Sequence, residues 1–205
     1  MTVLGWAQHI AHLPCGVQHH RAGEWKILLA EGKPAQTAHD RLALQVKCFD
    51  AGTGFLPTAP AKAMTLGAAI AVAQSQALYK LWPQLMDRCQ FSLSLRRATR
   101  PHAVPDDGRS WLLARKARQD DQNTHARFLT EIAAHFTLPA TPLRQTTDAT
   151  QCDFLVPRAH ADRFCGDIRS IVNTMDATDD ISLSVTGPWP PFAFAKLAQT
   201  AEGAA

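Results

Sequence analysis

Apolar residues in the first half of the chain alternate over short stretches and then recur with helical spacing. From Leu66 to Leu81 they recur at steps of four and three, which predicts an amphipathic helix that Pro83 kinks or ends. Between residues 90 and 95 apolar and polar side chains alternate, which predicts a half-buried strand. The other elements expected here are strands at residues 3–7, 25–30 and 55–56 and a helix at residues 36–48.

This order of elements predicts an α+β sandwich, in which helices cover one face of a mainly antiparallel sheet. A ferredoxin-like arrangement is one candidate for it. The periodicity then stops between residues 98 and 109, which hold two prolines, an Asp-Asp pair and a glycine, a composition typical of a linker. We therefore expect two small domains, an N-terminal α+β domain of residues 1–105 and a C-terminal α+β domain of residues 106–205.

The second half of the chain has a pattern of its own. Residues 110–135 predict a long helix with apolar ends, and its polar middle, residues 115–127, must be exposed or bridge two bodies. Residues 159–174 carry the clearest apolar stripe of the chain and predict a helix between strands at residues 152–156 and 181–185. The second domain is therefore also expected to be a mainly antiparallel sheet with helices on one face.

A segment rich in proline and aromatic residues follows the last expected strand. Each proline fixes φ and removes a backbone donor, so the chain is expected to leave the sheet at Pro188. Two compatible interpretations are a C-terminal clasp whose aromatic side chains close over a core, and a binding surface presented to a partner. The residues concerned, which we name the proline–aromatic segment, are Gly187, Pro188, Trp189, Pro190, Pro191 and Phe192.

The heptapeptide Thr186-Gly-Pro-Trp-Pro-Pro-Phe resembles the C-terminal signature of the gas vesicle protein F/L family. Trp111-Leu112-Leu113 is similar to the start of the family's second domain, and Phe192 stands where the family more often has tyrosine. The resemblance implies a non-enzymatic accessory protein for gas vesicle assembly, located in the cytoplasm and at the gas vesicle. It would bind the major gas vesicle shell protein and help its delivery or nucleation, with other gas vesicle accessory proteins as further partners.

Composition and charge restrict the other classes of partner. No apolar stretch reaches the eighteen or so residues that a membrane span needs, and the N-terminus lacks the basic region of a signal peptide, so we expect no membrane partner. The net charge is only +3, although eight Lys or Arg face four Asp between Arg96 and Arg127. The expected strands offer few aromatic side chains for base stacking, so we expect no nucleic acid.

The sequence has no recognisable catalytic motif, and we expect no catalytic residue, no cofactor and no metal. Its five cysteines include no C-x-x-C pair and are interpreted as small buried hydrophobic residues, and the Asp-Asp pairs as solvated charges. An α+β small-molecule enzyme or ligand-binding module is the alternative to an accessory protein, and a pocket of convergent polar side chains would distinguish it. The histidines that could share a cation, but are interpreted as surface residues, are His9, His12, His19 and His20.

Overall fold

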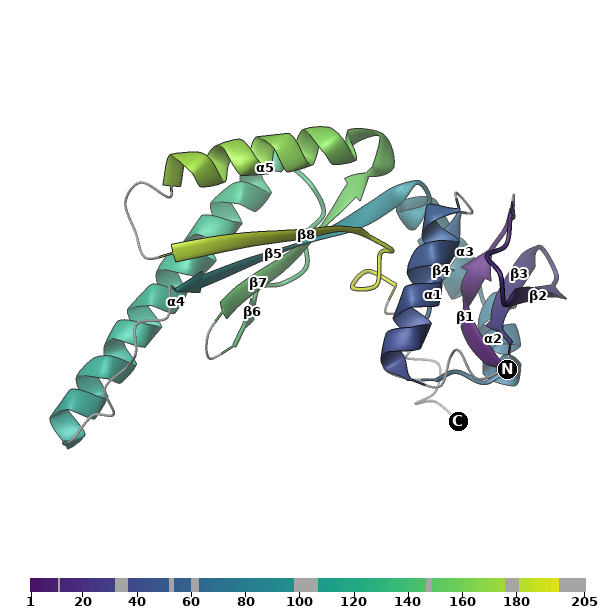
Figure 1. Cartoon of the computed structure of the whole chain (residues 1–205), viewed down its shortest axis with the longest axis horizontal. Coiled ribbons are helices and arrows are strands. Elements are labelled where there is room, and N and C mark those ends of the chain that lie inside the picture. The colour runs from purple at the N-terminus through teal and green to yellow at the C-terminus, as the bar shows by residue number, and fades with distance from the viewer. Residues whose placement is uncertain are drawn as a thin grey trace. The chain divides into compact units, whose positions relative to one another are not determined.

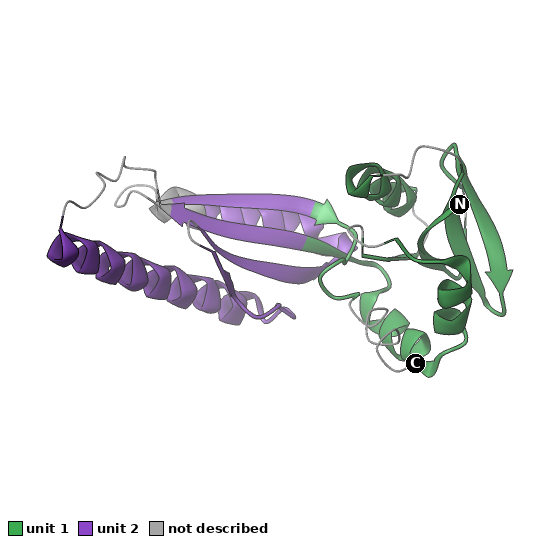
Figure 2. Cartoon of the chain, turned by 90° about the horizontal axis from the view of Figure 1, so that it is seen from below, with its two compact units in different colours: residues 1–90, 188–205 green, residues 91–187 purple. Residues whose placement is uncertain are grey.

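The computed structural model shows an α+β protein with two four-stranded sheets, which confirms the expected fold class (Figure 1). The chain divides into two compact units, residues 1–90 with 188–205 and residues 91–187 (Figure 2). In the described part of the chain no helix has the length and apolar character needed to cross a membrane. The structure describes residues 1–10, 12–31, 37–51, 54–59, 63–97, 107–146, 149–175 and 181–195.

The first sheet is antiparallel and has the strand order β2-β3-β1-β4. The expected strands are confirmed as β1 (Thr2–Ala7), β3 (Trp25–Ala30) and β4 (Phe55–Pro57). The sequence pattern does not predict β2 (Val17–Ala22), whose four central side chains are all exposed. An edge strand with polar residues on both faces lacks the alternation by which a half-buried strand is recognised.

Helix α1 (Ala38–Asp50) confirms the expected helix and begins with a capping box between Thr37 and Asp40. Its buried Gln45 holds the helix to the sheet. The Gln45 amide nitrogen donates hydrogen bonds to the backbone oxygens of Leu4 and Thr58, at 2.7 and 3.0 Å. The nitrogen of this buried side chain is therefore matched by backbone acceptors, whereas its Oε1 has no hydrogen-bond partner among the described residues.

The prediction of a single helix from Leu66 to Leu81 is wrong, because two helices occupy this stretch. They are α2 (Leu66–Ala73) and α3 (Gln76–Leu85). Gln74 and Ser75 separate them, and Ser75 is the N-cap of α3. The Ser75 hydroxyl donates to the Val72 oxygen at 2.7 Å, and this local bond closes the turn that ends α2. The apolar periodicity continues across the break and so conceals it. Pro83 lies in the last turn of α3, two residues before the helix ends.

The second sheet has the strand order β6-β7-β5-β8. The first of these strands along the chain, β5, was expected in the N-terminal sheet, and that expectation is wrong. Alternation of apolar and polar residues predicts a strand, but it does not predict which strands will pair with it. The succession β5-α4-β6-β7-α5-β8 is the βαββαβ order of ferredoxin-like folds, so that arrangement lies here and not in the first sheet. The elements are β5 (Arg88–Arg97), α4 (Gly108–Phe136), β6 (Arg144–Gln145), β7 (Ala149–Pro157), α5 (Ala161–Met175) and β8 (Ile181–Trp189).

An aromatic cluster forms part of the core of the second unit. The ring of Phe164 on α5 lies 5.1 Å from that of Phe91 on β5, 5.0 Å from Phe136 on α4 and 5.9 Å from Phe154 on β7, measured between centroids. Aromatic pairs at these separations stabilise a core beyond their area burial. Phe164 therefore joins both helices to the sheet.

A polar network crosses three neighbouring strands of the second sheet. The carboxylate of Asp153 on β7 is 1% exposed, accepts a hydrogen bond of 2.5 Å from the Ser92 hydroxyl on β5 and pairs with Arg144 on β6. A buried carboxylate is tolerated when it is paired and hydrogen-bonded, so we assign these three side chains a structural role.

The division expected between residues 105 and 106 lies outside the described residues. It stays a prediction, motivated by the loss of periodicity between residues 98 and 109. The compact units place residues 91–187 together, so this window connects two elements of one unit. If the expected division holds instead, limited proteolysis of the purified chain should cut first between residues 98 and 112, because linkers between compact domains are cleaved before packed elements. Fragments that begin far from this window, with the window itself resistant, would contradict the expected domains.

Candidate functional site

The proline–aromatic segment begins inside β8 and not after it. The strand runs through Gly187 and Pro188 to Trp189, so the expected exit from the sheet at Pro188 is wrong. The reason is that β8 is an edge strand, next to β5 on one side only. A proline is tolerated there because one side of an edge strand needs no backbone donor.

Gly187 has a backbone conformation that other residues rarely adopt. Its φ is +135°, in the region open almost only to glycine. The glycine and the two exposed residues beside it, Thr186 and Pro188, therefore set the direction in which the chain reaches Trp189. Gly187 is the position of the segment at which the backbone conformation requires glycine.

After Trp189 the chain folds into a tight turn with three local backbone hydrogen bonds. Phe192 N–H donates to the Pro190 oxygen at 2.7 Å, and the N–H groups of Phe194 and Ala195 donate to the Pro191 oxygen at 3.1 and 3.0 Å. The buried side chain of Gln90 accepts a further bond from Ala193 N–H at 2.8 Å. This turn is therefore held by its own backbone and by the side chain of Gln90 on β5.

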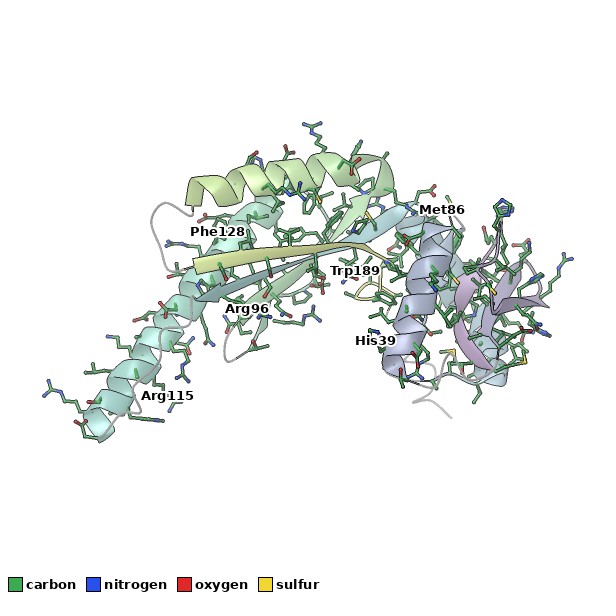
Figure 3. All side chains as sticks on the ribbon, in the orientation of Figure 1. His39, Met86, Arg96, Arg115, Phe128 and Trp189 are labelled. Atoms are coloured by element: carbon green, nitrogen blue, oxygen red, sulfur yellow. The ribbon has the colours of Figure 1, made fainter. Side chains whose placement is uncertain are left out.

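Burial within the proline–aromatic segment is uneven. Pro190 and Pro191 are buried, whereas Trp189, labelled in Figure 3, and Phe192 are half-buried. A side chain that is only half-buried can stabilise the fold with one face and contact a partner with the other. Both interpretations of the segment, clasp and presented surface, are therefore compatible with its geometry.

A second apolar surface lies at the start of α4. Trp111, Leu112 and Leu113 are 50%, 60% and 60% exposed, and the sequence pattern did not foresee this because an apolar helix end is normally packed. The polar stretch that follows is exposed up to Asp120, as expected, and the helix first buries a side chain at His125.

The perturbed titratable groups have structural causes. At the starts of α1 and α4, hydrogen bonds from Thr37 and Ser110 lower the pKa of the capping carboxyls of Asp40 and Asp107. Burial raises the pKa of the Cys48 thiol to about 11. These are effects of helix caps and of an apolar core, not signs of an acid, base or nucleophile prepared for catalysis.

The cysteines differ in exposure, whereas the four histidines at issue share it. Cys15 is exposed, so the expectation that all five cysteines are buried is wrong for it, and Cys165 is half-buried. Neighbouring residues of a strand point to opposite faces, which separates His19 from His20 on β2. The described residues contain no group of three or more His, Cys, Asp or Glu side chains that could hold a metal ion. The four histidines at issue are exposed: His9, His12, His19 and His20.

Two open depressions are found in the described surface. One, of about 420 Å³, is lined by residues of α1 and of the connection before β2, including His12, Lys47 and Asp50. The other, of about 290 Å³, lies where α4 ends and α5 begins and includes His135 and His160. None of the carboxyls and thiols with a shifted pKa lines either depression. Neither of these two depressions therefore shows the shifted titratable groups expected of a catalytic pocket.

A protein-family model matches part of this chain. The family model described as gas vesicle synthesis protein GvpL/GvpF matches residues 108–196, from the first residue of α4 to just beyond the proline–aromatic segment. Residues 108–196 of this chain are similar to the GvpL/GvpF family. This confirms the resemblance drawn from the sequence, and the family takes part in gas vesicle formation.

Two crystal structures of family members share the fold over nearly the whole chain. GvpF from Microcystis aeruginosa superposes with a TM-score of 0.71 at 11% identity, covering 96% of this chain and 98% of that one. GvpF from Anabaena sp. PCC7120 superposes with a TM-score of 0.63 at 14% identity, covering 96% and 95%. Identities this low show a common fold and no more. No curated protein sequence matches the chain.

Proposed function

We propose that this chain is a non-enzymatic accessory protein for gas vesicle assembly, which binds the major shell protein and helps its delivery or nucleation. The observation that carries the proposal is the match of residues 108–196 to the gas vesicle synthesis family. The fold shared with two GvpF structures over 96% of the chain supports it. We place the protein in the cytoplasm and at the gas vesicle, with other accessory proteins as further partners.

The physical need for such a protein is clear. A shell subunit that exposes a large apolar surface before it joins the wall aggregates unless another protein covers that surface. Trp189 ends β8 and Phe192 lies in the hydrogen-bonded turn after it, and both are half-buried. A contact made from a stiff segment loses little conformational entropy on binding, so we propose these two side chains as part of the shell-protein contact.

Binding to the purified shell subunit is expected to depend little on salt. Apolar burial is not screened, whereas exposed charge pairs are, and the net charge of +3 is small. A pull-down or titration of the shell subunit at low and high salt checks this, with affinity expected to change by less than about threefold, below 1 kcal/mol. Loss of all binding at high salt would assign the contact to the basic stretch from Arg96 to Arg127 instead.

A further inference from the structure

The first three turns of α4 project beyond the end of the sheet that the rest of the helix covers (Figures 1 and 2). We name residues 108–119 the α4 overhang. Every residue in it is exposed except Ala114, which is half-buried. The side chains of this part of the helix therefore contribute little to the core of their unit, whose buried α4 residues are His125, Leu129 and Ile132.

Three large apolar side chains lie in the first two turns of the overhang. Successive residues of an α-helix are separated by about 100° around its axis, so Trp111, Leu112 and Leu113 spread over roughly half of the circumference. These residues are 50–60% exposed to solvent, and we name Trp111, Leu112 and Leu113 the apolar collar. Large exposed apolar groups gathered at one place mark a surface for interaction more often than a structural accident.

The overhang also carries an excess of positive charge. Its cations are Arg109, Arg115, Lys116 and Arg118, and all four side chains are exposed. The acidic residues beside them are Asp107, which caps the helix by accepting a hydrogen bond of 2.7 Å from Ser110 N–H, and Asp120 and Asp121, which follow directly after the overhang. The exposed start of the helix adds its own positive partial charge. Arg115, labelled in Figure 3, lies over the ring of Trp111, 5.4 Å from its centroid, so charge and collar occupy the same place.

We propose that the α4 overhang docks into a groove of a partner protein that is lined by apolar side chains and rimmed by carboxylates. An enclosing groove can cover a collar that spans half of the helix circumference. Carboxylates on its rim would complement the four cations and the helix dipole. This goes beyond binding of the shell protein and does not depend on it, because it concerns a different surface and a partner defined by acidic charge.

Two other occupants fit these observations less well. A membrane-bound helix presents one continuous apolar face to the lipid, and Leu113 lies about 200° around the helix from Trp111. A second copy of the chain in a symmetric dimer through this surface would set four cations against the same four cations. An acidic protein groove meets neither objection.

A designed helical hairpin provides a defined probe. One version has leucines along its groove and glutamates on the rim, and a matched version has glutamine in place of each glutamate. We expect the full chain to bind the glutamate hairpin, in a salt-dependent way, at least about tenfold more tightly than the glutamine hairpin. The double variant Leu112→Ser, Leu113→Ser should lose binding by about tenfold or more, since truncated apolar anchors have effects of that size.

Ala117→Ser provides the control, because Ala117 is exposed on the same overhang outside the collar and the change should leave binding unaltered. Melting curves should be the same for all three proteins, since the substituted residues are exposed. Equal binding of both hairpins, equal binding by the double variant, or no binding at all would overturn the proposal. Collar-dependent binding to phosphatidylglycerol vesicles instead, or collar-dependent dimerisation, would replace the acidic protein with a membrane or a second copy. The shell-protein titration is read separately, so failure of one proposal leaves the other testable.

Discussion

Gly5→Ala is expected to unfold the N-terminal unit or to destabilise it by about 3 kcal/mol or more. A Cβ atom at Gly5 would lie 2.2 Å from the Leu56 backbone oxygen and 2.5 Å from the Phe55 ring. Gly5 sits in the centre of the first sheet, where it pairs with Leu28 on one side and Pro57 on the other. The backbone oxygen cannot move aside by a rotamer change, so β1 and β4 would have to separate.

Thermal or denaturant unfolding of the purified variant measures this effect. Gly67→Ala is the matched control, because nothing lies within 4 Å of a Cβ at that exposed position in α2. There the change should be neutral or stabilise by up to about 1 kcal/mol, as expected for alanine in a helix. A Gly5→Ala protein that melts with the wild type would show that β1 and β4 do not approach as closely as the structure has them.

Trp189→Ala is expected to destabilise the protein by about 3 kcal/mol, the lower end of the range for truncating a tryptophan, because Trp189 is half-buried. Its position is set by the backbone before it, where Gly187 has a φ of +135°, and by the hydrogen-bonded turn after it. Loss of the indole leaves a gap that this stiff segment cannot close. The melting temperature should fall, with Thr186→Ala, an exposed neighbour on β8, as the control.

The same variant separates the two interpretations of the proline–aromatic segment when binding is measured beside stability. If Trp189 is presented to the shell protein, truncation should weaken binding by about 2 kcal/mol or more, as it does for aromatic anchors at the centre of an interface. A large fall in the melting temperature with unchanged binding by the folded protein would make the segment a clasp alone. An unchanged melting curve together with unchanged binding would contradict both interpretations.

Only part of the candidate site could be predicted from the sequence. The heptapeptide from Thr186 to Phe192 is recognisable as a string, and the family match across residues 108–196 bears out the family that it indicated. The sequence pattern does not predict the exposure of Trp111, Leu112 and Leu113, because apolar residues at a helix end normally indicate packing against a core. Where the sheet stops beneath α4 determines whether they are covered, and that depends on strands distant in sequence.

The helices and most strands follow from local chemistry. The Ser92 to Leu95 alternation and the apolar stripe through Phe164 and Ile168 depend on residues a few positions apart, so periodicity alone locates β5 and α5. Even so, the short bond between Ser75 and Val72 divides an apparently continuous helix. A local hydrogen bond of this kind competes with the helix without changing its hydrophobic pattern.

The pairing of strands, in contrast, cannot be predicted from local sequence patterns. Whether β5 joins the first sheet or the second is decided by contacts such as that of Ser92 with Asp153, 61 residues later, and no local pattern contains that information. Pro188 shows the same dependence, since a proline that would end a central strand is accommodated where β8 forms an edge. Local periodicity therefore sets the type of each element. Sheet membership, edges and exposed helix ends arise only when distant segments meet, because burial and backbone pairing are properties of the assembled chain.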